Sequence, residues 1–261
     1  MNEPIGVFDS GIGGLAVIKK ILDYFPHKDV VYFGDTARMP YGNKDPELIF
    51  SYTKQNIDFL RSKNVETVVA ACGTASTVML KKKYDYGIPV FGIVIPLCKS
   101  AVKITKNKRI AVVATETAII SNEYKRTIQN ISKDIEIFQQ ECPTLATMIE
   151  NNTSYDSLIE ILNVCLLPLI KKNIDVLILG CTHYSIIKNI INDIFKDIVI
   201  VDPAQEMADF LKGEFCQEKI IDKKGRLDIF VSKLSGNFVE NVKLFFGETV
   251  AQNIKVIDYI P

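Results

Sequence analysis

Residues 68–80 read VVAACGTASTVML, a short apolar run that ends at Cys72 and continues into a stretch with helical spacing. The β-branched residues at the beginning predict a strand, and the small and polar residues after it predict the start of a helix. The thiol of Cys72 is therefore expected where a strand meets a helix. A free cysteine is most often a small buried hydrophobe, so this stretch alone favours packing over chemistry.

Junctions of the same kind recur along the chain. Apolar runs occupy residues 5–8, 30–33, 65–71 and 90–95 in a first set, and residues 109–114, 135–138, 174–179 and 198–201 in a second set. Short apolar strands that alternate with helices are typical of parallel sheets covered on both faces. Two such sets predict two pseudo-symmetric α/β domains with parallel sheets. Because ligands of these sheets bind at the carboxyl ends of the strands, the site is expected in the cleft between the domains.

The end of the chain extends this plan. A helix from about Gln205 is followed by expected strands at 229–232 and 254–257. Such a tail can return to complete the first domain. We therefore expect a first domain of residues 1–95 plus 210–261 and a second domain of residues 96–209.

Composition excludes several classes of protein. The 261 residues include 31 basic and 31 acidic side chains, a balance that argues against a nucleic-acid partner. No apolar segment has the length of a membrane span, and the first residues, MNEPIGVFDSG, do not resemble a signal peptide. The cysteines at 72, 98, 142, 165, 181 and 216 are widely spaced, without a CxxC pair. They are interpreted as reduced thiols of a cytoplasmic protein, and no metal site is expected.

A second cysteine shares the setting of the first. Residues 176–185 read VLILGCTHYS, which again places a cysteine, Cys181, between an apolar strand and a helix start. Unpaired N–H groups and the helix dipole at such a position favour a thiolate and lower its pKa. Two such thiols on opposite faces of one small ligand make a base and an acid. That arrangement suits the inversion of a stereocentre and needs neither a metal nor an organic cofactor.

Four motifs connect these residues to a known family. DSGIGGL at 9–15, YFGDTARMPYG at 32–42, ACGTAS at 71–76 and GCTHY at 180–184 resemble the glutamate racemases of the cofactor-independent aspartate/glutamate racemase superfamily. The resemblance implies L/D-glutamate interconversion that supplies D-glutamate for peptidoglycan, without a cofactor. It implies Cys72 and Cys181 as the catalytic pair, with acid–base partners at Asp9, Glu150 and His183. The substrate-binding positions that it implies are Asp9, Ser10, Pro40, Tyr41, Gly42, Gly73, Thr74, Thr182 and His183.

Several of these residues also have a purely structural interpretation. Asp9 can be a helix cap, Glu150 a solvated acid at a helix end, and Tyr41-Gly42 a simple turn. His183 can equally be an ordinary histidine at a helix start. The cysteines without the strand–helix setting are interpreted as packing residues: Cys98, Cys142, Cys165 and Cys216. The expected partner is an amino-acid substrate, a small molecule, and a homodimer is a further possibility.

The sequence departs from the family pattern at four places. Gly73 stands where the family usually has Asn, and Thr115-Glu116-Thr117-Ala118 stands for Thr-Glu-Gly-Thr. Residues 142–147 and Ser185 also differ. All four changes are expected at strand ends that face the cleft. Gly73 removes an amide and is expected to free space, so another amino acid is an alternative substrate. If the lost amide only costs affinity, Gly73→Asn should lower KM for glutamate.

Two further alternatives come from other classes. Residues 11–16, GIGGLA, fit the G-x-G-x-x-G/A pattern of a dinucleotide-binding oxidoreductase, and Asp35 stands near the place of a ribose-binding acid. Against this reading, Asp9 would place a negative charge beside the pyrophosphate, and both cysteine motifs would have no task. A catalytically inactive relative that only binds its ligand is the other alternative. The intact acid–base residues favour a working enzyme.

Overall fold

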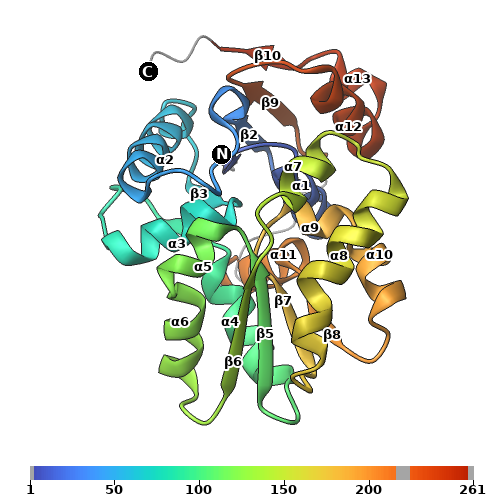
Figure 1. The fold of residues 1–261 in the computed structure, drawn as a ribbon. Coiled ribbons are helices and arrows are strands. Elements are labelled where there is room, and N and C mark those ends of the chain that lie inside the picture. Colours follow the sequence, from blue (N-terminus) through green and yellow to red (C-terminus); the bar gives the residue numbers. More distant parts are fainter. Residues whose placement is uncertain (1–2, 216–223, 258–261) are drawn as a thin grey trace.

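Two parallel sheets form the framework of the protein, as the computed structural model shows for residues 3–215 and 224–257 (Figure 1). The first sheet has the strand order β10-β9-β2-β1-β3-β4 and the second has the order β6-β5-β7-β8. The ten strands are β1 (Ile5–Asp9), β2 (Val30–Gly34), β3 (Thr67–Ala70), β4 (Val90–Gly92), β5 (Arg109–Ala114), β6 (Glu136–Glu141), β7 (Val176–Leu179), β8 (Val199–Val201), β9 (Leu227–Val231) and β10 (Lys255–Val256). The predicted fold class, two α/β units with parallel sheets, is confirmed.

Helices connect the strands and cover the sheets. Those of the first part of the chain are α1 (Gly13–Tyr24), the 3-10 turn η1 (Thr36–Arg38), α2 (Pro46–Arg61), α3 (Gly73–Lys82) and α4 (Val94–Ile104). Those of the middle are α5 (Glu116–Ser121), α6 (Glu123–Ile131), α7 (Leu145–Glu150), α8 (Tyr155–Ile170), α9 (His183–Ile186) and α10 (Lys188–Ile194). The last three are α11 (Pro203–Glu214), α12 (Gly236–Phe246) and α13 (Glu248–Ala251). None of the described helices is long and apolar enough to cross a lipid bilayer.

The register of the strands explains how loops distant in sequence meet. In the first sheet Ile5 pairs with Val30 on one side and with Thr67 on the other, so β1, β2 and β3 end at the same edge. The loops after these strands are therefore brought together. In the second sheet Ile110 pairs with Val176, which brings the ends of β5 and β7 to a common edge in the same way.

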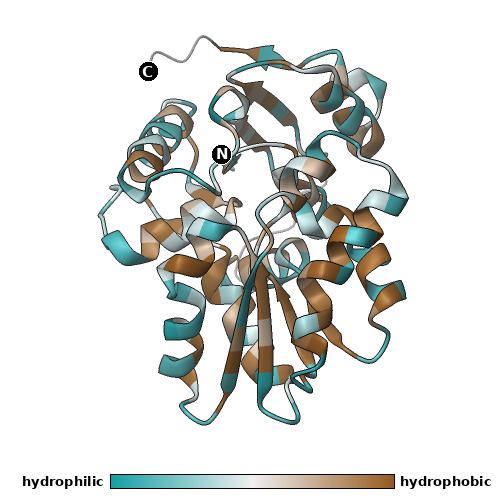
Figure 2. Ribbon diagram, viewed as in Figure 1, coloured by the Kyte–Doolittle hydropathy of each residue, from teal (hydrophilic) through white to brown (hydrophobic). Residues whose placement is uncertain are grey.

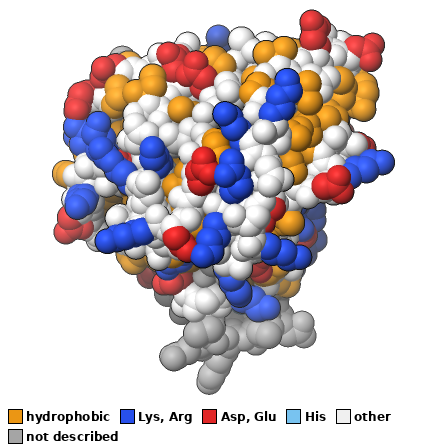
Figure 3. All heavy atoms as spheres, turned by 60° about the horizontal axis from the view of Figure 1, so that its bottom comes forward, with side chains coloured by type: hydrophobic (Ala, Val, Ile, Leu, Met, Phe, Trp, Pro, Cys, Tyr) orange, Lys and Arg blue, Asp and Glu red, His pale blue; other side chains and the backbone are white. Residues whose placement is uncertain are grey.

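The two sheets share their packing. One continuous apolar core includes residues of β1, β5 and β7 together with the inner faces of α1, α4 and α11. Figure 2 shows this as strands that are hydrophobic over most of their length, with hydrophilic residues on the outer helix faces. The outer surface carries charges of both signs, which are interspersed on the face shown in Figure 3. Burial of apolar surface on both sides of each sheet is what favours this arrangement over a single open layer.

The tail of the chain rejoins the first sheet. Strand β9 pairs with β2 from Val30 to Gly34, and β10 pairs with β9. Helix α11 packs against α1 and α4. The division at residues 95/96 and 209/210 stays a prediction.

Two expectations from the sequence are corrected. The run at 90–95 is not one strand, because β4 ends at Gly92 and α4 begins at Val94. Pro96 fits within the first turn of α4, because N–H groups in the first turn of a helix have no hydrogen-bond partner within the helix. The reading of all cysteines as reduced thiols is also wrong, because Cys142 and Cys165 form a disulfide. The turn after β6 packs on α8 and brings their Cα atoms to 5.9 Å, within disulfide range. The packing role expected of Cys216 lies outside the described residues.

Candidate active site

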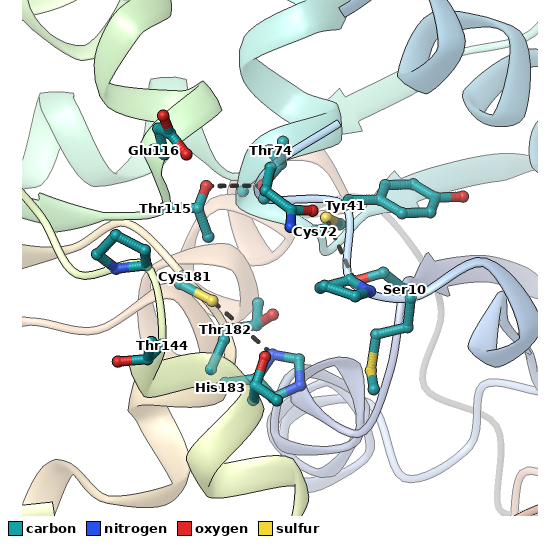
Figure 4. Close-up of a pocket in the computed structure, with 18 of the residues that line it drawn as sticks. Ser10, Tyr41, Cys72, Thr74, Thr115, Glu116, Thr144, Cys181, Thr182 and His183 are labelled. Carbon is teal, nitrogen blue, oxygen red and sulfur yellow. Dashed lines mark hydrogen bonds between the residues drawn. The ribbon is translucent and has the colours of Figure 1, made fainter. Parts of the chain in front are cut away.

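The candidate site is a pocket between the carboxyl ends of the two sheets, with a volume of about 480 Å³ (Figure 4). This volume lies in the usual range for small-molecule sites. Ten of the sequence-predicted site residues line the pocket: Ser10, Pro40, Tyr41, Gly42, Cys72, Gly73, Thr74, Cys181, Thr182 and His183. The remaining two, Asp9 and Glu150, lie behind this lining and bond to it. The fold therefore brings all twelve to one place.

The two cysteines reach the pocket from different sheets. Cys72 follows β3 and is the residue before the first turn of α3, while Cys181 follows β7 and precedes α9. Both are buried, yet both line the same cavity (Figure 4). Cys98 is also a free buried cysteine, but it contacts the carbonyl of Tyr124 and not the pocket. The two strand–cysteine–helix junctions of the sequence therefore lie at the same pocket.

A chain of contacts leads from Cys181 to Glu150. The Sγ atom of Cys181 lies 3.8 Å from Nδ1 of His183, and Nε2 of the same ring lies 2.6 Å from Oε2 of Glu150. Burial acts against a charged imidazole, but the bonds and charges of Cys181 and Glu150 outweigh it and raise the pKa of His183 well above 6.5. Glu150 is buried at the end of α7, so the interpretation as a solvated acid is wrong.

Asp9 has no exposure to solvent and is held by two donors. Its Oδ1 accepts the N–H of Gly11 at 2.8 Å, and its Oδ2 accepts the hydroxyl of Thr182 at 2.9 Å. Burial raises the pKa of Asp9, whereas His183 and these two bonds act in the opposite direction. The Thr182 bond joins the end of β1 to the loop after β7. Asp9 therefore connects the two halves of the site.

The expected low pKa of Cys72 is wrong, because its pKa is raised. Burial, together with the nearby charge of Asp9, raises the pKa of the Cys72 thiol to about 12. The N–H of Ala75 and the hydroxyl of Ser10 favour the thiolate but do not compensate. The helix start thus acts as expected, but loss of solvent and a nearby acid dominate. Cys72 is therefore a thiol at neutral pH.

The predicted substrate-binding residues differ in whether their polar side-chain groups point into the pocket. The hydroxyl of Thr74 lies 2.8 Å from that of Thr115, its neighbour in the pocket wall (Figure 4). The hydroxyl of Tyr41 bonds to Asp35 and accepts from Asn56, so Tyr41 turns its polar group away from the cavity. Tyr41 and Gly42 line the pocket, while their carbonyls accept the N–H groups of Lys44 and Thr117. Ser10 keeps its hydroxyl near Cys72, at 3.8 Å.

The glycine loop of residues 11–14 is occupied by the opposite half of the molecule. The N–H of Ile12 donates to Oε2 of Glu150 at 3.1 Å. A Cβ atom at Gly11 would lie 2.7 Å from that same oxygen, and one at Gly13 would lie 2.4 Å from the Thr182 hydroxyl. These glycines allow the close approach of polar side chains. A pyrophosphate would meet a carboxylate here, which counts against the dinucleotide-binding alternative.

Two expectations about the family differences are also corrected. Gly73 does not free space, because the carbonyl oxygen of Gly180 lies 2.0 Å from the position that a Cβ would take. Ser185 does not face the cleft; its hydroxyl donates to Asp202. The other two altered segments do line the pocket, through Thr115 and Glu116 and through Pro143, Thr144, Ala146 and Thr147.

Some supporting residues were not found from the sequence. The hydroxyl of Tyr32 donates to the carbonyl of Gly11 at 2.6 Å, and Nδ2 of Asn237 donates to the carbonyl of Glu150 at 3.1 Å. Both fix the backbone of a site residue. Asn237 lies near the start of α12, far along the chain, and nothing in its local sequence distinguishes it.

The fold and this site define the class of two-domain α/β racemases. The model of the family described as Asp/Glu/Hydantoin racemase matches residues 5–211, and the chain belongs to this family. A glutamate racemase of Thermoanaerobacter pseudethanolicus is 37% identical, over 98% of both chains. Among solved structures, glutamate racemase isoform RacE1 from Bacillus anthracis has a TM-score of 0.91 at 30% identity, covering 98% of this chain and 97% of that one. The glutamate racemase of Francisella tularensis in complex with D-glutamate has a TM-score of 0.88 at 30% identity, over 98% of each.

Proposed function

We propose that this protein interconverts L- and D-glutamate by moving a proton at Cα between two cysteines. The observation that carries the proposal is that Cys72 and Cys181 follow strands of two different sheets and line one pocket of about 480 Å³. The family match and the named relatives support the same reaction. Its role is the supply of D-glutamate for peptidoglycan.

The proposed reaction has two proton transfers. A thiolate on one face of the substrate removes the α-proton, so that the Cα–H bond breaks and an S–H bond forms. The electron pair left at Cα delocalises into the substrate carboxylate. The thiol on the opposite face then gives its proton to Cα and becomes a thiolate. The product is the other enantiomer, and the same steps run in reverse with the roles exchanged.

The acid–base partners would set the charge of the thiols. The pKa of His183 is raised beside Glu150, and its Nδ1 lies 3.8 Å from the sulfur of Cys181, within reach of a proton on that thiol. Cys72 is a thiol at neutral pH because burial and Asp9 oppose its ionisation. The α-ammonium group of an arriving amino acid would bring a positive charge to this negative environment. That charge would lower the pKa of Cys72 when the substrate is bound.

The remaining predicted residues would hold the substrate. Hydroxyl groups of Ser10, Thr74 and Thr182 and backbone groups of Tyr41 and Gly42 surround the pocket. Thr115 faces Thr74 and would share its task. Backbone N–H groups at the starts of α3 and α9 would stabilise negative charge on the substrate carboxylate. A cytoplasmic location is a prediction, and a homodimer is a possibility that light scattering of the purified protein would test.

Hydrogen exchange at Cα tests the proposal. The protein is incubated in D₂O with each of a panel of L- and D-amino acids, and the α-proton signal is followed by NMR. Loss of the signal from both glutamate enantiomers, with formation of the opposite enantiomer, is the expected result. Exchange with a different amino acid and not with glutamate would contradict the substrate assignment. The altered pocket segments at 115–118 and 142–147 would then account for the alternative specificity.

A further inference from the structure

Gly73 lies where the two halves of the site touch through their backbones. It is the first residue of α3, directly after Cys72. A Cβ atom at this position would lie 2.0 Å from the carbonyl oxygen of Gly180 and 3.1 Å from its carbonyl carbon. The backbone of Gly73 is not left-handed, so the absence of a side chain matters here for space and not for conformational freedom.

The carbonyl of Gly180 has little freedom to move aside. It accepts the hydroxyl of Tyr124 at 3.1 Å, and the N–H of Gly180 donates to the carbonyl of Val113 at 2.8 Å. Gly180 is itself confined, because a Cβ on it would lie 2.7 Å from that of Ala114. The end of β7 is therefore fixed within the second sheet. A side chain at position 73 could be accommodated only by moving α3 away from it.

We propose that Gly73 is a positioning residue that sets the separation of the two catalytic thiols. Cys72 immediately precedes Gly73 and Cys181 immediately follows Gly180, so the backbone contact lies directly between the two cysteine-bearing turns. The proposal deepens the proposed function and rests on it. It replaces the expectation that Gly73 makes room for a larger substrate.

The chemistry gives this role a specific signature. Inversion at Cα needs both thiols within reach of one carbon, on opposite faces. Removal and return of the proton on a single face needs only one thiol, whose proton exchanges with solvent. A side chain at position 73 that separates the two turns would therefore suppress inversion more strongly than it suppresses exchange without inversion.

The experiment compares Gly73→Ala with Gly236→Ala. Gly236 is the first residue of α12, as Gly73 is of α3. Apart from its chain neighbours and its own helix, no atom of the described residues lies within 4 Å of the position of its Cβ. Each protein is given L-glutamate in D₂O. Deuterium in the recovered L-glutamate and formation of D-glutamate are measured separately, together with the thermal unfolding midpoint.

The expected result is a fall of about 100-fold in D-glutamate formation by Gly73→Ala, the usual cost of a displacement of about 1 Å. Deuterium entry into the recovered L-glutamate should fall much less. Gly236→Ala should match the wild type in both rates. Gly73→Asn should behave like Gly73→Ala, and should not improve KM.

A second substitution tests the mechanism of the contact. Tyr124→Phe removes the hydroxyl that holds the Gly180 carbonyl, so Gly73→Ala/Tyr124→Phe should regain part of the inversion lost in Gly73→Ala.

The proposal is overturned if inversion and exchange fall in parallel, or if Gly73→Ala keeps the wild-type rate. It is also overturned if neither Gly73 variant folds, because Gly73 would then be needed for folding and not for the approach of two folded halves. Failure of the proposed function is distinct, since the wild type itself would then show no exchange with glutamate.

Discussion

Glu150 lies 2.6 Å from His183, and the same carboxylate oxygen accepts the N–H of Ile12 at 3.1 Å. One buried acid thus fixes the imidazole beside Cys181 and the loop that follows β1. Because Glu150 and His183 belong to the second half of the site and Ile12 to the first, the acid also joins the two halves. Loss of its charge is expected to affect both the protonation of His183 and the closure of the pocket.

Glu150→Gln should lower the pKa of His183. The amide keeps an oxygen for the N–H of Ile12 but removes the negative charge that favours the imidazolium. The chain has only two histidines, so the ring-proton NMR signals can be assigned with a His27→Gln variant. In the wild type His183 should stay protonated well above pH 6.5. The same titration midpoint in Glu150→Gln and the wild type would contradict this assignment.

The raised pKa of His183 also has a consequence for stability. Its pKa in the folded protein lies above that of the unfolded chain, so its contribution is fully present below about pH 6.5. The contribution is lost as the pH rises through the folded-state pKa. Glu150→Gln should reduce this pH-dependent part of the free energy of unfolding.

Cys72→Ala should change how stability depends on alkaline pH. The thiol has a pKa of about 12 in the folded protein and 9.0 as its ordinary value, so its contribution is present below pH 9 and lost toward pH 12. Between pH 8 and 10 the wild type should lose about 1.4 kcal/mol relative to Cys72→Ala. Urea unfolding at both pH values measures this difference.

The control for that measurement is Ser10→Ala. It removes a neighbour of Cys72 that does not itself titrate in this range. The pH-dependent loss should therefore persist in Ser10→Ala. A difference between the wild type and Cys72→Ala that is independent of pH would show that the thiol is not desolvated as described.

Much of the fold could be predicted from the sequence, because it depends on short-range patterns. The buried strands are continuous apolar runs, and each ends in the polar or glycine-rich residues that form the pocket edge. Parallel topology follows from strands that alternate with helices. The end of β4 was missed because the apolar run continues without a break into α4, where periodicity alone does not distinguish a strand from a helix.

From the sequence, only those site residues could be predicted that lie in a repeated pattern or in a motif shared with the family. Cys72 and Cys181 were found because the same local plan occurs twice, and the roles of Asp9, Glu150 and His183 came from resemblance. The position of the Gly180 carbonyl against Gly73 depends on how two separate sheets pack, which no local pattern encodes. The same holds for Asn237, and for the pairing of Cys142 with Cys165, whose distance depends on how α8 lies against β6.

Cys165→Ala should destabilise the unreduced protein. The disulfide with Cys142 spans 23 residues, and a cross-link of that length contributes about 3 kcal/mol in the loop-entropy model. Dithiothreitol should lower the free energy of unfolding of the wild type and leave that of Cys165→Ala unchanged. Peptide mapping of the unreduced protein should recover the peptides that contain Cys142 and Cys165 joined by a disulfide.

Cys98→Ala is the matched control, since Cys98 is a free and buried cysteine. It should lose packing free energy but keep the response to dithiothreitol. If reductant has no effect on the wild type, the cross-link does not contribute to stability. Because Pro143 and Thr144 follow Cys142 in the pocket wall, KM for glutamate should also rise in Cys165→Ala.

The two-thiol account is tested most directly by Cys72→Ser and Cys181→Ser, each assayed in D₂O with L- and with D-glutamate. A hydroxyl is too weak an acid to replace either thiol, so racemisation should fall by about 10²–10⁴-fold in both variants. Each variant keeps one thiol on one face and should exchange the α-proton of only one enantiomer. The account predicts opposite enantiomers for the two variants. Racemisation near the wild-type rate in either variant, or exchange of the same enantiomer by both, would contradict it.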